Sequence, residues 1–167
     1  MNKGKGKKGM TIGMVFVFIV AAITFALIMI FGYKTIADFM GKGEEVEFYR
    51  FKTDLETSIK QIYSDYGSVR IEEFNLPMKY KHICFVNLDA PYPEDCDFDA
   101  YACDVWKDAG SYEKGEENVF LEPIAPVGIK VYKISMEGNY LCLNISKGTF
   151  KLRLEGKGDR TYLALAR

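Results

Sequence analysis

The chain has 167 residues and a formal net charge of −1, from 22 basic and 23 acidic side chains. Four lysines lie within the first eight residues, so the rest of the chain carries 18 basic against 23 acidic residues and a net charge of −5. This balance lacks the basic patch that nucleic-acid binding requires, and we therefore expect no nucleic-acid partner. Residues 34–167 are numerous enough for one domain with its own core.

A basic leader, residues 1–9, precedes a long uncharged run. Lysines occupy positions 3, 5, 7 and 8, and no charged residue occurs from Gly9 to Tyr33. About 20 apolar residues at 1.5 Å rise span the roughly 30 Å hydrocarbon core of a bilayer, so residues 10–33 are predicted to form a transmembrane helix. Because positively charged flanks stay in the cytoplasm, we expect the N-terminus inside and residues 34–167 outside the cytoplasmic membrane.

A cleaved secretory signal peptide is the main alternative to a retained membrane anchor. The apolar part of a signal peptide is typically about 7 to 15 residues long, and this run is longer. Its small residues Ala21, Ala22 and Ala26 lie in mid-run instead of closing it. A buried helix of a soluble protein would show polar residues at helical spacing, which the run lacks. We therefore interpret residues 10–33 as a retained anchor.

A second, amphipathic helix is predicted from Glu44 to Tyr66. Its apolar positions recur every three or four residues and form one stripe: Phe48, Phe51, Leu55, Ile59, Ile62 and Tyr66. Gly41 and Gly43 each cost about 1 kcal/mol relative to alanine inside a helix, so we expect a hinge between the two helices there. Gly67 is placed to end the second helix in a left-handed conformation. The stripe predicts a core-facing helix, with a partner-binding surface as the alternative.

The remainder of the chain is predicted to form an antiparallel sheet. Short β-branched or aromatic runs, separated by turn residues, predict six strands: 69–76, 81–88, 128–136, 140–145, 149–154 and 161–166. A long acidic and aromatic loop, residues 89–118, lies between the second and the third of them. The expected fold is therefore α+β, with a membrane helix, an amphipathic helix and an antiparallel meander, the last two forming one ectodomain over residues 34–167.

Four cysteines occur in the part of the chain that we expect outside the cell. An even number in an oxidising compartment predicts two disulfides. A zinc site is disfavoured because no C-x-x-C pair exists and His82, expected at a strand surface, is the only histidine. Cys96 and Cys103 are close enough in sequence for a local bridge within the acidic loop. Cys84 and Cys142 lie on the wetter faces of two predicted strands, so we predict the pairs Cys96–Cys103 and Cys84–Cys142, the second requiring neighbouring strands.

The acidic loop contains one weak candidate for a metal site. Asp95, Asp97 and Asp99 alternate along the chain as the oxygen ligands of a calcium loop do. The match ends there, because Ala100 occupies the position where an EF-hand needs glycine and Trp106 the position where it needs glutamate. A solvated acidic loop is therefore the preferred interpretation, and no metal or cofactor is expected.

Two further features of the sequence bear on function. The sequence contains no G-x-S-x-G, no H-E-x-x-H and no phosphate-binding glycine loop, so no enzymatic activity is predicted. Asn144-Ile145-Ser146 matches the N-glycosylation sequon in the expected compartment. Asn144 is therefore a candidate for glycosylation.

The junction between the leader and the apolar run carries a family resemblance. Lys7-Lys8-Gly9, followed at once by Met10-Thr11-Ile12-Gly13-Met14 and a long apolar helix, resembles the class III signal peptide of archaeal type IV pilin-like proteins. The resemblance implies that a prepilin-type peptidase cuts between Gly9 and Met10. The apolar helix would then become the stem of a filament subunit and contact like subunits. The resemblance covers residues 1–40 by motif and the remainder by the order of helix and sheet.

Together these features predict a single-pass membrane-anchored surface protein, a pilin-like subunit or minor component of an archaeal cell-surface filament. A helix without a polar face is buried by lipid or, outside the bilayer, by neighbouring helices through the hydrophobic effect. The alternative is an anchored ectodomain that does not polymerise and binds a surface ligand or partner.

Overall fold

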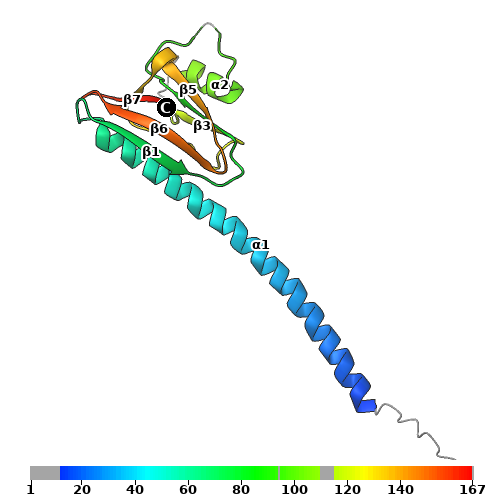
Figure 1. Ribbon diagram of the computed structural model, residues 1–167. Coiled ribbons are helices and arrows are strands. Elements are labelled where there is room, and N and C mark those ends of the chain that lie inside the picture. The colour runs from blue at the N-terminus through cyan, green and yellow to red at the C-terminus, as the bar shows by residue number, and fades with distance from the viewer. Residues whose placement is uncertain (1–11, 94, 110–114, 167) are drawn as a thin grey trace, which may run out of the picture. The chain divides into compact units, whose positions relative to one another are not determined.

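The computed structural model describes residues 12–93, 95–109 and 115–166 (Figure 1). By its internal contacts the chain divides into two compact units, Met1–Gly43 and Glu44–Arg167. All the buried residues of the described part belong to the second unit, which therefore holds the hydrophobic core.

The N-terminal helix α1 extends from Ile12 to Ile62. It remains helical at Gly41 and Gly43, so the predicted break between two helices is wrong. A glycine inside a helix costs only about 1 kcal/mol relative to alanine, and the long flanking helical stretches outweigh this cost. The boundary between the two compact units nevertheless falls directly after Gly43. The helix ends four residues earlier than predicted, and Gly67 adopts the predicted left-handed conformation, with φ of 81°.

The C-terminal part of α1 has one buried face. Five positions of the predicted stripe are buried: Phe48, Phe51, Leu55, Ile59 and Ile62. Tyr66, the sixth, is 84% exposed because the helix has already ended before it. The core-facing interpretation of the stripe is thus confirmed over residues 48–62.

A four-stranded sheet packs against this stripe. Its strands lie in the order β1 (Val69–Asn75), β6 (Thr149–Gly156), β7 (Thr161–Leu165) and β4 (Ile134–Ser135). All neighbouring strands are antiparallel except β4 and β7, which are parallel. Figure 1 shows the C-terminal part of α1 running along β1. Phe51 packs edge-on against Phe74 and Phe150, with ring centroids 6.3 and 6.1 Å away, so one helical side chain contacts two strands.

A second sheet of three antiparallel strands completes the core. Its order is β3 (Val119–Glu122), β2 (His82–Val86) and β5 (Tyr140–Asn144). Alternate residues of β2 and β3 join the main core: Ile83, Phe85, Val119 and Leu121. Cys84 and Phe120, on the opposite face, join a smaller cluster with Trp106 of helix α2 (Ala100–Ala109). A short 3₁₀ helix, η1 (Glu137–Asn139), precedes β5.

The strand order corrects the predicted meander. β5 and β6 are consecutive strands joined by the predicted turn at Lys147-Gly148, yet they lie in different sheets. The strand predicted at 128–136 is reduced to β4, because Val131 pairs with the side chain of Asn118 and not with a strand. The segment predicted as a loop, residues 89–118, contains α2, and β3 follows it directly. Neither α2 nor β3 was predicted.

Two glycines allow close approaches between these elements. A Cβ at Gly148, where φ is +75°, would lie 2.6 Å from the carbonyl oxygen of Leu76. A Cβ at Gly156 would overlap the carbonyl oxygens of Ile62 and Asp65. The end of β6 therefore contacts the C-terminal end of α1 so closely that no side chain fits between them.

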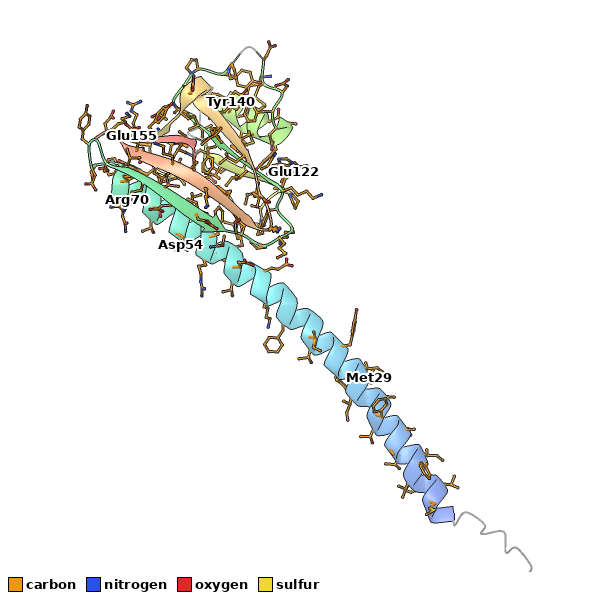
Figure 2. All side chains as sticks on the ribbon, viewed as in Figure 1. Met29, Asp54, Arg70, Glu122, Tyr140 and Glu155 are labelled. Atoms are coloured by element: carbon orange, nitrogen blue, oxygen red, sulfur yellow. A yellow bond between two sulfur atoms is a disulfide. The ribbon has the colours of Figure 1, made fainter. Side chains whose placement is uncertain are left out.

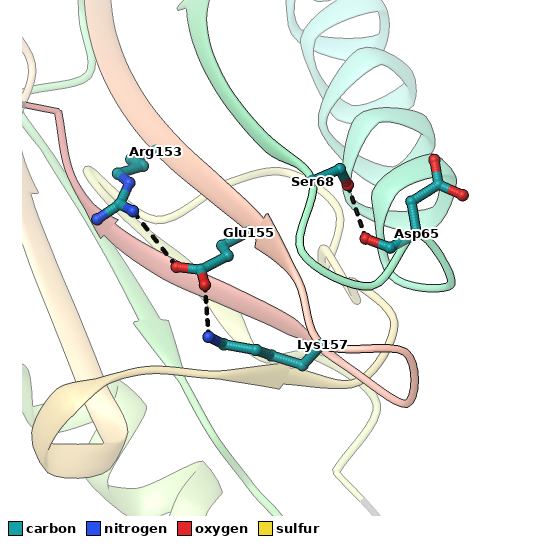
Figure 3. Close-up of polar contacts among 5 residues, drawn as sticks. All are labelled: Asp65, Ser68, Arg153, Glu155 and Lys157. Carbon is teal, nitrogen blue, oxygen red and sulfur yellow. Dashed lines mark hydrogen bonds and ion pairs between the residues drawn. The ribbon is translucent and has the colours of Figure 1, made fainter.

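Polar contacts surround this meeting point (Figure 3). The Ser68 hydroxyl donates to the backbone carbonyl of Asp65 at 2.7 Å. Glu155 accepts a hydrogen bond from Lys157 Nζ at 2.5 Å and lies 3.4 Å from the guanidinium of Arg153. The hydrogen bond from Lys157 lowers the pKa of the Glu155 carboxyl below its ordinary value. Ion pairs at a protein surface contribute little to stability, so these contacts mainly orient the turn after β6.

Candidate functional site

The first candidate site is the apolar segment of α1, which we define as Gly13–Gly32. Every residue of the apolar segment is exposed. Figure 2 shows its side chains, Met29 among them, projecting around the helix. A surface helix of a globular domain buries one apolar stripe, whereas this segment is apolar on all sides. Within the described residues, α1 is the one helix that is long and apolar enough to cross a membrane.

The threonine hydroxyls in this part of α1 are satisfied within the helix. Thr24 Oγ1 donates to the carbonyl of Val20, and Thr35 Oγ1 donates to the carbonyl of Phe31, both at 2.8 Å. A hydroxyl without a hydrogen bond is costly in an apolar environment. These two bonds remove that cost, so the surface of the segment is suited to lipid or to the side chains of neighbouring helices.

The second candidate feature is the set of cysteines. Cys84 of β2 lies directly opposite Cys142 of β5, with their Cα atoms 4.1 Å apart, and the two form a disulfide. The Cα atoms of Cys96 and Cys103 are 5.8 Å apart, and these residues form the second disulfide. The structure thus brings together the two predicted pairs, and β2 and β5 are neighbours as expected.

The segment around Cys96 and Cys103 is packed and is not merely a solvated loop. Trp106 of α2 is 1% exposed, and its indole N–H donates to the carbonyl of Ala90 at 3.1 Å. The ring of Phe98 stacks on that of Tyr140 at the start of β5, with centroids 4.2 Å apart. This segment therefore covers one end of the three-stranded sheet.

The aspartates proposed as weak calcium ligands lie at the start of α2. The Asp99 carboxylate accepts a hydrogen bond from the backbone N–H of Ala102 at 2.9 Å, which is the bond of a helix N-cap. Asp95 and Asp97 precede it in irregular chain. Within residues 12–93, 95–109 and 115–166, no group of three or more histidine, cysteine or acidic side chains is arranged to hold a metal ion.

A hydrogen bond also joins α2 to the chain before β3. The Tyr101 hydroxyl donates to the Glu117 carboxylate. This hydrogen bond raises the pKa of Tyr101 above its ordinary value. Both side chains lie at the surface, so the bond positions α2 and has no evident chemical role.

Asn144, the sequon residue, lies at the exposed end of β5. It is opposite His82 in the register of β2 and β5, and His82 is in turn opposite Glu122 of β3. His82 Nε2 lies 3.8 Å from the Glu122 carboxylate, and both side chains are largely exposed. His82 is thus a strand-surface residue, as expected, in an open row of polar side chains.

A cavity of about 530 Å³ lies between the end of β2 and the chain that leads into β4. Its lining includes Leu88, Val131 and the charged residues Asp89, Lys130 and Lys133. The volume is in the range of ligand pockets, roughly 300–1,000 Å³. Lys130 Nζ, however, already donates to the carbonyl of Gly115 at 2.6 Å. Asp89 also offsets the lysine charges, so the lining does not converge on one class of ligand.

The sequence carried signals that the interpretation of residues 89–118 as a loop missed. Asp99 as an N-cap, followed by the buried positions Ala102, Cys103 and Trp106, is a helix pattern. The role of Asn118 carries no such signal, because its partner Val131 is distant in sequence. The predicted processing residues Gly9 and Met10 lie outside the described residues. No protein-family model, curated protein or solved structure matches the chain.

Proposed function

We propose that the protein is anchored in the cytoplasmic membrane by a single helix, with residues 34–167 outside. The observation that supports this proposal is the apolar segment, Gly13–Gly32, which is exposed on all sides and whose one hydroxyl, that of Thr24, is bonded within the helix. Leaving apolar surface in water costs about 25 cal/mol per Å², so a bilayer or neighbouring helices must cover it. The four lysines of the leader set the orientation with the N-terminus inside.

We further propose that the protein is a pilin-like subunit, or a minor component, of a cell-surface filament. The basis is the resemblance of the leader and its junction to the class III signal peptide. Removal of the leader between Gly9 and Met10 takes away the four lysines that hold the N-terminus at the cytoplasmic surface. The apolar segment can then exchange lipid for the helices of like subunits without exposing an unpaired hydroxyl.

Processing is tested on the full-length protein from its own membranes. The mature chain is expected to begin at Met10, and Gly9→Leu is expected to leave a precursor that is heavier by the nine leader residues. Gly13→Leu is the matched control, because it adds the same side chain at a position where nothing lies within 4 Å of the added Cβ, and it should be processed normally. A wild-type chain that retains its leader would reject the filament proposal.

Topology is tested separately, with protease added to sealed right-side-out vesicles. Residues 34–167 are expected to be digested, and full protection would reject the orientation whatever the state of the leader.

The alternative is an anchored ectodomain that binds a surface ligand without polymerising. The cavity beside Lys130 and Lys133 is the observation that favours it. The two functions differ in how copies contact one another. Phe25→Cys, at an exposed position of the apolar segment, should give disulfide-linked dimers in a filament and remain monomeric in a simple anchor.

A further inference from the structure

β5 forms an open edge of the three-stranded sheet. The backbone N–H and C=O groups of Leu141 and Leu143 face β2. The register of the two strands and the hydrogen bonds at both ends of β5 require this orientation. Because these bonds alternate in an antiparallel pair, the remaining backbone N–H and C=O groups point away from β2. They belong to Tyr140, Cys142 and Asn144.

The other edge strands, β1, β3 and β4, each have a feature that prevents pairing with another chain. β1 carries three charged residues: Arg70, Glu72 and Glu73. β3 is covered where Val119 forms a bridge with Ile129, and β4 is only two residues long. Charge, cover and shortness all prevent an edge strand from pairing with another chain. β5, with the sequence YLCLN, has no charge and no proline.

The two ends of β5 differ in their surroundings. Phe98 stacks on Tyr140 and covers the first end. Asn144, at the other end, is exposed, and so is Ser146 two residues later. The unprotected end of the edge is therefore the end that carries the sequon Asn144-Ile145-Ser146.

We propose that Asn144 is N-glycosylated and that the glycan protects the open edge of β5. The inference rests on the proposed function in one respect, because it requires residue 144 to lie outside the membrane. An oligosaccharide is hydrophilic and bulky. At this position it prevents the approach of a second strand, as a lysine would on another edge.

The modification is a transfer from a lipid-linked oligosaccharide, catalysed by a membrane oligosaccharyltransferase. The side-chain amide nitrogen of Asn144 attacks the anomeric carbon of the donor sugar. A carbon–nitrogen bond forms, the bond from that carbon to the lipid phosphate oxygen breaks, and the phosphorylated lipid leaves. The amide loses one proton to the enzyme's base, and no oxidant or reductant is needed.

The first experiment is mass spectrometry of the full chain from its own membranes. Trypsin cuts after Lys133 and Lys147, so one peptide, residues 134–147, carries the sequon. After reduction of the Cys84–Cys142 disulfide, this peptide is expected in the wild type to exceed its polypeptide mass by one oligosaccharide. Ser146→Ala should abolish the excess and Ser146→Thr should keep it. Asn139→Gly, in the same peptide at a position with φ of 66°, is the control and should also keep it.

An unmodified peptide would overturn the inference, and vesicle proteolysis shows whether the proposed topology falls with it. If external protease digests residues 34–167 and the peptide is unmodified, the glycosylation is wrong and the membrane proposal stands. If the domain is protected and the peptide is unmodified, both are wrong.

The second experiment tests protection of the edge with two variants that both lack the sequon. Asn144→Gln leaves β5 without charge, whereas Asn144→Lys places a charge on the edge. In detergent at equal protein concentration, sedimentation is expected to show a shift from monomer to oligomer for Asn144→Gln relative to Asn144→Lys. Equal sedimentation of the two variants would show that the uncharged edge of β5 does not associate without a glycan. That result would reject the protective role of the glycan.

Discussion

Asn118 replaces a β-strand partner with a side chain. It is 7% exposed, its amide nitrogen donates to the carbonyl of Val131 at 3.0 Å, and its amide oxygen accepts from the N–H of Val131 at 2.8 Å. A carboxamide offers one acceptor and donors, as a peptide group does. The chain around Val131 is therefore held in the core although it belongs to no strand.

Asn118→Ala should consequently lower the free energy of unfolding more than the replacement of a polar residue usually does. It leaves the buried N–H and C=O of Val131 without partners, and we expect a loss of about 3 kcal/mol in the free energy of unfolding. Urea denaturation monitored by circular dichroism measures it. Asn75→Ala, on an exposed residue of β1, is the matched control and should stay within about 0.5 kcal/mol of the wild type. Equal stability of the two variants would contradict the role assigned to Asn118.

Among the structural elements, the two disulfides differ mainly in the length of chain that they close. Cys84 and Cys142 are 58 residues apart in sequence and join two strands of one sheet. Cys96 and Cys103 are 7 residues apart and bracket the start of α2. The first restricts the unfolded chain much more than the second does, because the entropy of closing a loop grows with its length.

Removing each pair by double substitution should therefore cost unequal amounts. On the chain-entropy model, Cys84→Ala with Cys142→Ala loses about 4 kcal/mol, and Cys96→Ala with Cys103→Ala loses about 2 kcal/mol. Denaturant unfolding under non-reducing conditions gives both values. A larger loss from the local pair would mean that packing of α2 outweighs the entropy of the longer loop.

Elements with a strong local pattern could be predicted from the sequence, and elements that depend on distant partners could not. The stripe of α1 follows from spacings of three and four residues, and its burial is confirmed over residues 48–62. The turn at Lys147-Gly148 has the same local chemistry whether it joins paired strands or strands of two sheets. The meander was therefore a natural error, and the parallel pairing of β4 with β7 had no local signal.

At the scale of the whole molecule, the core lies entirely within Glu44–Arg167. We expect residues 44–167, produced alone in an oxidising compartment, to fold and to unfold in one cooperative transition. Leu55→Ala, at a fully buried position, should lower the unfolding free energy by about 3 kcal/mol. Tyr49→Ala, on a residue that is 45% exposed, serves as the control. Aggregation of the fragment without a cooperative transition would show that the first unit is needed for folding.

The connectivity of the two sheets also sets the order in which they can form. The three-stranded sheet and both disulfides come from one continuous stretch, residues 82–144, whereas β1 must wait for β6, residues 149–156. On the proposed topology the N-terminus stays inside and the ectodomain emerges outside from residue 34 onward, so the chain can oxidise and close its smaller sheet while the apolar stripe of α1 is still uncovered. The stripe is then an exposed apolar surface on a partly folded chain. Cells that make this chain must shield that surface, at the outer face of the membrane, until the last two strands arrive.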